Sequence, residues 1–157
     1  ELLVNTFKSG NKVLVCGNGG SLADAMHFAE EWTGRFRNDR IPYPVLALAD
    51  PTHMSCTAND YGYDMVFARG VQAFGKAGDL CFLLSTTGNS KNLVQAAKCC
   101  REIGVTTVGF LGQGGGVLAP LCDWKWVAPG ETSDRIQELH MMALHILIEV
   151  SEHKLNG

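Results

Sequence analysis

The sequence has no excess of positive charge and no long hydrophobic run. Thirteen Lys and Arg residues stand against sixteen Asp and Glu residues, for a formal net charge of −3, and the basic residues do not cluster. Proteins that bind nucleic acid usually carry a basic patch or stripe. Apolar runs such as residues 80–84 are far shorter than the roughly 20 residues of a membrane-spanning helix. We therefore expect neither a nucleic-acid partner nor a membrane partner.

The sequence also lacks a secretory signal and any C-x-x-C pair. The N-terminus has no basic segment followed by an apolar run and a cleavage site. Of the six cysteines, Cys16 and Cys81 lie in apolar runs, where cysteine behaves as a small hydrophobic side chain. These features predict reduced thiols in a cytoplasmic protein. Hydrophobic residues make up 46% of the chain and charged residues 18%, which excludes a disordered protein.

Short apolar strands alternate with helical patterns along the chain. This alternation is typical of βαβ units, and continuous apolar strands are expected where helices cover both faces of a parallel sheet. The 157 residues predict one domain, an α/β fold in a single three-layer sandwich. The predicted strands are 12–16, 44–48, 80–84, 106–110 and 124–127. The predicted helices are 21–35, about 65–74, 90–103, a shorter one at 115–121, and 132–153.

Two strand-to-helix turns carry small and hydroxyl side chains. Cys16-Gly-Asn-Gly-Gly-Ser21 follows the first predicted strand, and Ser85-Thr-Thr-Gly-Asn-Ser90 follows the third. In open α/β sheets, ligands bind outside the carboxyl ends of the strands, where such turns gather. The first turn is not a dinucleotide fingerprint, because the G-x-G-x-x-G pattern that begins at Gly17 has Leu22 in its last position. No P-loop sequence occurs either.

The second turn is the better anion site. Ser85, Thr86, Thr87 and Ser90 place four hydroxyls around Gly88, just before a predicted helix. A helix N-terminus offers unpaired N–H groups and the positive end of the helix dipole, so a phosphate monoester fits there. The alternative is that the hydroxyls only cap the helix and close the turn. Four hydroxyls in six residues favour the phosphate.

His27 and Glu31 are four residues apart and share one face of a predicted helix. Three interpretations of this pair are open: a simple surface hydrogen bond, two ligands of a metal ion, or a catalytic base with its partner. On the last predicted helix, Gln137 and His145 lie on adjoining parts of one side. His145 stands in an apolar stretch and needs a hydrogen bond, a metal or a substrate. His140 is an equal candidate, and periodicity does not choose between the two.

A polar island, Ala58-Asn-Asp-Tyr-Gly62, interrupts a plain stretch. Asn and Asp before Gly are common turn chemistry, so the island predicts a turn and by itself indicates no function. His53 and His153 stand in a loop-like and a terminal setting without special context.

Six stretches follow one another along residues 12–154. They are Cys16-Gly-Asn-Gly-Gly-Ser21, Ala25-Met-His-Phe-Ala-Glu-Glu31, Thr33-Gly-Arg35, Asn59-Asp-Tyr-Gly62, Ser85-Thr-Thr-Gly-Asn-Ser90 and Asp134-Arg-Ile-Gln-Glu138 with the later His145. Together they resemble the phosphoheptose isomerase family of the sugar isomerase (SIS) domain superfamily. The Ser-Thr-rich turn alone indicates only a SIS domain, whereas the second and last stretches are more specific.

The resemblance implies a flavodoxin-like SIS domain with a five-stranded parallel sheet over residues 1–157, in which residues 1–10 are the tail of an N-terminal helix. It implies an isomerase that converts sedoheptulose 7-phosphate to D-glycero-D-manno-heptose 7-phosphate, the first step toward the heptose of bacterial lipopolysaccharide or related surface glycans. It also implies a homotetramer with active sites between subunits. Since only the tail of that helix is present, the resemblance implies the tetramer less directly than the fold.

Carried over by position, the resemblance also implies the roles of individual residues. It places the phosphate on Ser85, Thr86, Thr87 and Ser90, the sugar on Asn18, Gly19, Gly20, Asn59, Asp60 and Gln137, one Zn²⁺ per subunit on His27, Glu31, Gln137 and His145, and the acid/base pair on Glu31 and His145. Thr87 stands where many relatives have Ser, and it keeps the hydroxyl. Ketose–aldose isomerisation needs a carboxylate base and an acid at the carbonyl oxygen. Zinc ligation and proton abstraction compete for Glu31.

Other functions remain open. A non-catalytic SIS protein that binds the replication initiator DnaA shares the fold and much of the glycine-rich turn, although the set His27, Glu31, Gln137 and His145 favours an enzyme. A sugar-phosphate sensor domain is less expected, since such domains usually accompany a DNA-binding domain. An isomerase of another sugar phosphate is the nearest enzymatic alternative.

Overall fold

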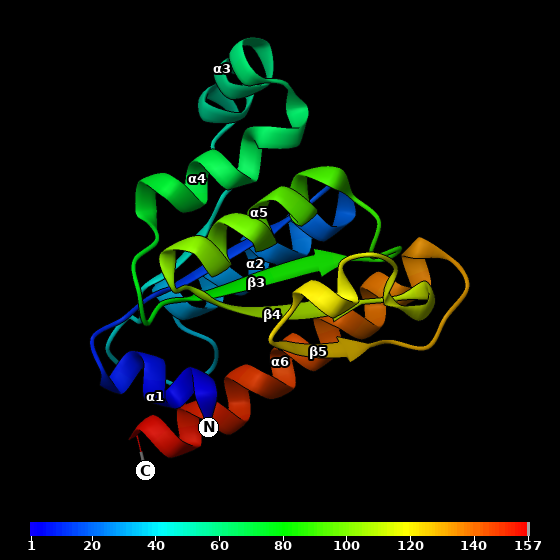
Figure 1. Cartoon of the computed structure of the whole chain (residues 1–157). Coiled ribbons are helices and arrows are strands. Elements are labelled where there is room, and N and C mark those ends of the chain that lie inside the picture. The colour runs from blue at the N-terminus through cyan, green and yellow to red at the C-terminus, as the bar shows by residue number, and fades with distance from the viewer. Residues whose placement is uncertain (157) are drawn as a thin grey trace.

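The computed structural model describes residues 1–156, which form a three-layer α/β sandwich (Figure 1). One sheet of five parallel strands runs in the order β2-β1-β3-β4-β5. The strands are β1 (Val13–Gly17), β2 (Val45–Ala47), β3 (Leu80–Ser85), β4 (Thr106–Leu111) and β5 (Trp124–Val127). All five predicted strands are confirmed, with ends that differ by one residue at most.

The strand order is the flavodoxin-like one. From β1 the chain first adds β2 on one side and then adds β3, β4 and β5 on the other side, so the order of the strands reverses between β1 and β3. Val13 lies opposite Val45 on one side and Leu80 on the other. Every residue of β1 and β3 is buried, which explains their continuous apolar sequence. The two glycine- and hydroxyl-rich turns follow these two central strands. They therefore meet at the topological switch point, where such folds bind ligands.

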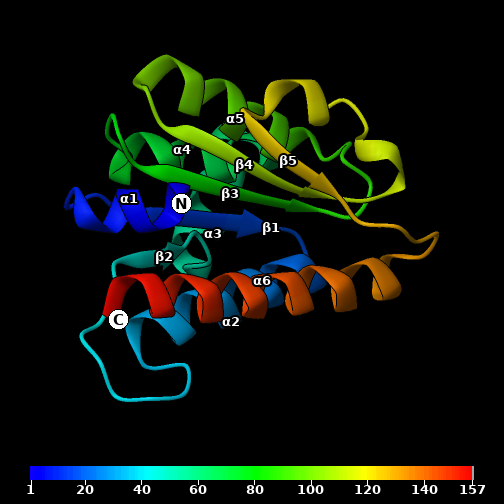
Figure 2. The same ribbon diagram turned by 90° about the horizontal axis from the view of Figure 1, so that it is seen from below.

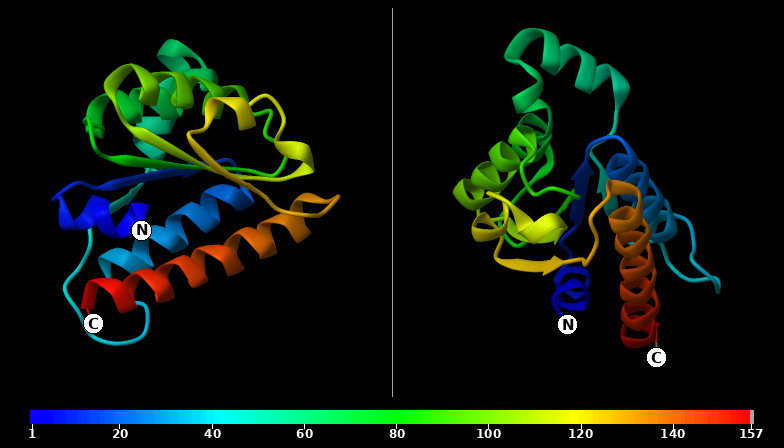
Figure 3. Two further views of the ribbon diagram at one scale, coloured as in Figure 1. Left: turned by 60° about the horizontal axis from the view of Figure 1, so that its bottom comes forward. Right: turned by 90° about the vertical axis from the view of Figure 1, so that its right-hand side faces the viewer.

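Helices cover both faces of the sheet (Figure 3). They are α1 (Leu2–Lys8), α2 (Gly20–Thr33), α3 (Pro51–Tyr61), α4 (Val66–Phe74), α5 (Lys91–Ile103) and α6 (Ser133–Asn156). One buried cluster joins α4 and α5 to the sheet through residues such as Phe67 and Leu93. The other joins α1, α2 and α6 to the opposite face through residues such as Phe7, Phe28 and Leu144.

Helix α1 lies within residues 1–10, which the resemblance assigns to the tail of a longer N-terminal helix. Leu3 and Phe7 are buried in the same cluster as Ile148 of α6, and Figure 1 shows α1 beside the C-terminal end of the chain. Figure 2 shows α6 lying along α2 on this side of the sheet. The six cysteines are free, and five of them, Cys16 and Cys81 included, are buried. Among residues 1–156 no helix combines the length and the apolar character that crossing a membrane requires.

Two predictions about secondary structure are wrong. Residues 115–121 form no α-helix: two short 3₁₀ turns, Gln113–Gly115 and Ala119–Leu121, stand there instead. Gly114, Gly115 and Gly116 all have positive φ (80°, 85° and 53°), a left-handed conformation that ends a right-handed helix.

The polar island at residues 58–62 is not a turn between plain stretches but the end of helix α3, which the sequence analysis does not predict. The start of α3 carries a recognisable signal. The Asp50 side chain accepts a hydrogen bond from the His53 N–H (2.6 Å), and Pro51 occupies the first helical turn. Figure 1 shows α3 projecting from the layer formed by α4 and α5.

Candidate active site

A cavity of about 350 Å³ lies at the carboxyl ends of β1 and β3. It is lined by Asn18, Gly19, Gly20, Ser21, Leu84, Ser85, Thr86, Thr87, Ser90, Ser133 and Gln137. All of these side chains are uncharged, but α2 and α6 begin at the cavity and α5 begins one residue beyond it. Three helix N-termini therefore direct the positive ends of their dipoles toward it, which suits an anion.

The turn after β3 is held by its own hydroxyls. The Gly88 N–H donates to Ser85 Oγ (3.0 Å), the Asn89 N–H donates to Thr87 Oγ1 (3.2 Å), and Ser90 precedes α5 without a side-chain cap hydrogen bond. The hydroxyls thus close the turn, as the alternative to a phosphate site predicts, but the Ser90 side chain does not cap helix α5. Gly88 has φ +66°, and a Cβ there would lie 2.0 Å from the Gly115 carbonyl oxygen. Only glycine allows this approach.

The Thr86 side chain contacts a residue outside its own turn. Its Oγ1 lies 2.9 Å from the hydroxyl of Ser133, the first residue of α6. This contact joins the turn after β3 to the helix that carries Gln137 and His145. Ser133 is a cavity residue that the sequence analysis missed, because it stands within the predicted helix 132–153 and no local pattern connects it to Thr86.

The turn after β1 brings Gln137 to the start of α2. A Cβ added to Gly20 would lie 2.4 Å from Gln137 Oε1, so the glutamine side chain rests directly on this glycine. The Asn18 amide exchanges two hydrogen bonds with the Asn92 amide (3.0 and 2.9 Å) and accepts one from the Tyr63 hydroxyl (3.0 Å). Asn92 and Tyr63 are further contacts that the sequence analysis did not predict, because no local pattern connects them to Asn18.

His27, Glu31 and His145 meet between α2 and α6. His27 Nε2 lies 3.1 Å from His145 Nε2 and 3.4 Å from Glu31 Oε1. His27 Nδ1 lies 3.0 Å from the exposed Glu30 carboxylate. The choice between His140 and His145 is therefore decided: His140 is fully buried elsewhere, with its Nε2 3.0 Å from the Leu111 carbonyl oxygen.

The carboxyl groups of Glu31 and Asp24 have raised pKa values. Burial is the largest cause of the raised pKa of Glu31, and the neighbouring Glu30 adds to it, while His27 and His145 oppose it. Burial also raises the pKa of Asp24 to about 6, against the opposing charge of His27. Asp24 Oδ2 is buried without a hydrogen-bond partner among the described residues. A carboxylate whose proton is held more tightly is a better base.

The donor set fits a zinc ion. One ligand atom each from His27, Glu31 and His145 lies within 4.8 Å of the others. Tetrahedral zinc with Zn–N and Zn–O bonds of about 2.1 Å keeps its ligand atoms roughly 3.4 Å apart, close to the 3.1 and 3.4 Å found here. Gln137 lines both the uncharged cavity and the groove that holds His145. It stands between the two halves of the site.

Asn59 and Asp60 lie apart from these groups. Both are exposed in the last turn of α3, where the Asn59 amide donates to the Asp60 carboxylate (2.9 Å). They line a separate surface pocket with Pro51, Thr52, Ser55 and Cys56. Within this chain the structure does not bring them to the cavity.

Comparison with known proteins agrees with this arrangement. The family model of the SIS domain matches residues 1–112. The phosphoheptose isomerase of Fusobacterium nucleatum is 52% identical over 149 residues, which span 95% of this chain and 77% of that protein. The solved phosphoheptose isomerase structures from Neisseria gonorrhoeae and Francisella tularensis are 35% and 30% identical, with TM-scores of 0.91 and 0.93, and each match covers 97% of this chain and 82% of the other.

The identity and the coverage of these matches show common ancestry. This chain belongs to the phosphoheptose isomerase family of SIS-domain proteins.

Proposed function

We propose that this chain converts sedoheptulose 7-phosphate to D-glycero-D-manno-heptose 7-phosphate. The observation that carries the proposal is the junction at Gln137 between an uncharged cavity at three helix N-termini and the cluster of His27, Glu31 and His145. The cavity suits a phosphate group, and the cluster supplies a carboxylate and an imidazole for proton transfer. The names of the relatives described above support the same reaction.

In this proposal the phosphate is bound by the turn after β3. The hydroxyls of Ser85, Thr86, Thr87 and Ser90 and the first N–H groups of α5 receive it, with Ser133 as a further hydroxyl in the same cavity. Gly19 and Gly20 let the backbone approach the sugar. Gln137 and the Asn18 side chain contact its hydroxyls, and for Asn18 this requires a change in its bonds to Asn92 and Tyr63.

Glu31 is the proposed base and His145 its acid partner. The Glu31 carboxylate takes a proton from C1 of the ketose, which leaves an enediol, and returns it to C2. His145 moves the second proton from O1 to O2, so the product is the aldose and no other reactant is needed. A Zn²⁺ bound by His27, Glu31, Gln137 and His145 would polarise the oxygens at C1 and C2. Zinc ligation would weaken Glu31 as a base. We propose that the zinc organises the site and that Glu31 still performs the proton transfer.

We further propose that residues 1–157 form a single SIS domain that assembles as a homotetramer with active sites between subunits. The position of Asn59 and Asp60 supports this assembly, since the pocket that they line shares no residue with the cavity of their own chain. The heptose product would enter lipopolysaccharide or a related surface glycan. The free cysteines support a cytoplasmic location.

The binding of DnaA by a non-catalytic SIS protein is not favoured. The relatives described above are isomerases, and the cluster of His27, Glu31 and His145 has no evident purpose in a scaffold.

The test is a turnover assay. The purified protein is incubated with sedoheptulose 7-phosphate, and the aldose is followed by NMR before and after treatment with a chelator. We expect conversion before treatment and a loss of conversion after it that added Zn²⁺ restores. The absence of conversion in the untreated protein and in the protein supplied with Zn²⁺ would overturn the proposed function.

A further inference from the structure

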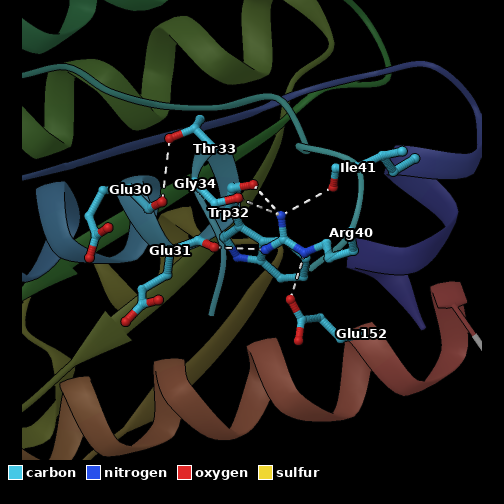
Figure 4. A network of polar contacts seen from close by, with 8 residues as sticks. All are labelled: Glu30, Glu31, Trp32, Thr33, Gly34, Arg40, Ile41 and Glu152. Carbon is cyan, nitrogen blue, oxygen red and sulfur yellow. Dashed lines mark hydrogen bonds and ion pairs between the residues drawn. The ribbon is translucent and has the colours of Figure 1, made fainter. Parts of the chain in front are cut away.

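Arg40 is a buried arginine next to the end of α2, outside the proposed catalytic and ligand groups. Its side chain is 5% exposed. One terminal nitrogen, Nη2, donates to the carbonyl oxygen of Glu31 (2.7 Å), and the other, Nη1, donates to those of Trp32 (2.8 Å) and Gly34 (3.2 Å). Figure 4 shows the guanidinium in the middle of these carbonyls. One charged group therefore binds several carbonyl oxygens at the end of one helix.

This position stabilises the C-terminus of α2. The last carbonyls of a helix have no partner within the helix and form the negative end of its dipole. A guanidinium placed there donates hydrogen bonds to the carbonyls, and its positive charge is attracted to the negative end of the helix dipole. It also lies 5.5 Å from the centre of the Trp32 ring and 5.4 Å from that of Tyr43, where cation–π contact adds to its fixation.

Arg40 also joins α2 to α6. Its Nε donates to Glu152 Oε1 (2.6 Å), and the Glu152 side chain is only 15% exposed. Glu152 follows His145 by seven residues, which is two helical turns and thus the same face of α6. The guanidinium therefore contacts the backbone of Glu31 at one edge and, at another, the helix face that presents His145.

The distances in the proposed catalytic cluster depend on this junction. His27 and Glu31 come from α2 and His145 from α6, and the His27–His145 distance of 3.1 Å exists only while the two helices keep their relative position. A displacement of about 1 Å in a catalytic group is enough to reduce a rate by about 100-fold.

We propose that Arg40 is a positioning residue of the isomerase reaction, which fixes the Glu31 end of α2 against the His145 face of α6. The proposal rests on the proposed function for its effect on turnover. Its structural part, the fixation of the end of α2, is independent of the substrate.

Arg37 offers a matched control. It lies in the same connecting segment and binds the same helix, with its guanidinium on the Glu149 carboxylate (2.6 and 3.3 Å). Its side chain is 60% exposed, however, and its hydrogen bonds reach only a side chain, not the carbonyls of α2. An exposed ion pair of this kind contributes little to stability.

The experiment compares Arg40→Lys with Arg37→Lys in the full chain. Lysine keeps the charge but loses the planar set of donors. For Arg40→Lys we expect kcat to fall by about 10- to 100-fold while KM for sedoheptulose 7-phosphate stays within about threefold. Amide hydrogen exchange at residues 30–34 should become faster, with α5 unchanged. Because Arg37 lines the groove that holds His145, Arg37→Lys is the control for hydrogen exchange only, and we expect its exchange at residues 30–34 to be unchanged.

A rescue experiment separates positioning from general stability. Arg40→Ala with added guanidinium should regain part of its kcat, whereas the same concentration of sodium ion should not restore it. A cavity of about 350 Å³ bounded by residues 36–40 and α6 gives the small cation access to the vacated position.

Each of the following outcomes would overturn the proposal. One is a folded Arg40→Lys protein with wild-type kcat and wild-type exchange, and another is exchange at residues 30–34 that is equally accelerated in Arg37→Lys. If neither Arg40 variant folds, Glu152→Gln provides the test, because it removes the charged partner of Arg40 and keeps an acceptor; wild-type kcat and exchange in it would count equally against the proposal. If wild type itself does not turn over the sugar phosphate, the proposed function fails, and unchanged exchange in Arg40→Lys then decides against the fixation of α2.

Discussion

The two ends of the proposed site are built in different ways. At the phosphate end, four of the hydroxyl side chains come from residues 85–90, and their turn closes on itself through hydrogen bonds such as Gly88 N–H to Ser85 Oγ. At the proton-transfer end, His27 and His145 stand 3.1 Å apart although 118 residues separate them in the sequence. The first end is a local structure of one turn. The second exists only because α2 packs against α6.

The two ends also differ in charge. The phosphate cavity has no charged lining residue and relies on hydroxyls and helix N-termini. The proton-transfer end gathers two histidines and the carboxylates of Glu31 and Asp24, whose pKa values are raised mainly by burial. Binding and chemistry should therefore respond separately to mutation, metal and pH, and each of the following experiments tests that separation.

The largest effect is expected for Glu31→Gln. The amide keeps the size of the side chain but cannot accept the C1 proton, so kcat should fall by about 1,000-fold, within the range of general base catalysis. KM for sedoheptulose 7-phosphate should change less than threefold, since the phosphate end is untouched. Steady-state kinetics measure both constants. The control is Glu102→Gln, on the exposed surface of α5; appreciable activity in Glu31→Gln would exclude Glu31 as the base.

Metal removal should produce the next largest effect. A chelator should lower kcat by about 100-fold, because a Lewis acid contributes several kcal/mol to this kind of transition state. The affinity for inorganic phosphate, measured by calorimetry, should stay within about twofold. His27→Gln should lower the zinc content, determined by elemental analysis, below one ion per chain. A chelated protein with full activity, or one that no longer binds phosphate, would contradict the separation of the two ends.

Thr86→Val is expected to have a smaller effect, and to change KM rather than kcat. The change keeps the shape of the side chain and removes a hydroxyl that lines the phosphate cavity and contacts Ser133. A lost hydrogen bond to a charged group costs about 1.5 to 3 kcal/mol, so KM should rise at least about tenfold while kcat stays within threefold. Thr106→Val in β4 is the control. A fall of kcat with unchanged KM would show that Thr86 belongs to the chemical end.

The smallest effect is expected for the pH dependence of stability in Asp24→Asn. With a pKa of about 6 instead of the usual 3.8, Asp24 holds its proton more tightly in the folded state. The folded protein therefore binds more protons between these values, and the stability contributed by Asp24 is lost as the pH rises from about 4 to 6.

The asparagine side chain in Asp24→Asn does not ionise, so this variant does not lose stability as the pH rises. Its melting temperature should therefore exceed that of wild type by about 2–4 °C at pH 7.5. That range corresponds to about 1 kcal/mol, after allowance for partial exposure. At pH 4 the two proteins should melt together. Thermal unfolding by circular dichroism measures both, with the exposed Asp39→Asn as control; an equal gain at both pH values would contradict the assignment.

Much of the fold and half of the site are predictable from the sequence. All five strands are, because a strand buried on both faces is a continuous apolar run that needs no partner to be recognised. The gathering of hydroxyls in the turn after β3 is predictable for a similar reason, since these residues are neighbours in the chain. Helix α3 is missed although Asp50 and Pro51 signal its start, because its exposed residues give no clear apolar period.

Tertiary structure alone decided the rest. Periodicity left His140 and His145 as equal candidates, and only the packing of α6 buries one against Leu111 and turns the other toward His27. The contacts of Ser133 with Thr86, of Asn92 with Asn18 and of Arg40 with the end of α2 also join residues without a shared local pattern. The sequence by itself determined the strands and the hydroxyl-rich turn after β3, since both depend on neighbours along the chain. The proton-transfer cluster depends on two helices meeting across 118 residues, which the packing of side chains on one face of the sheet determines.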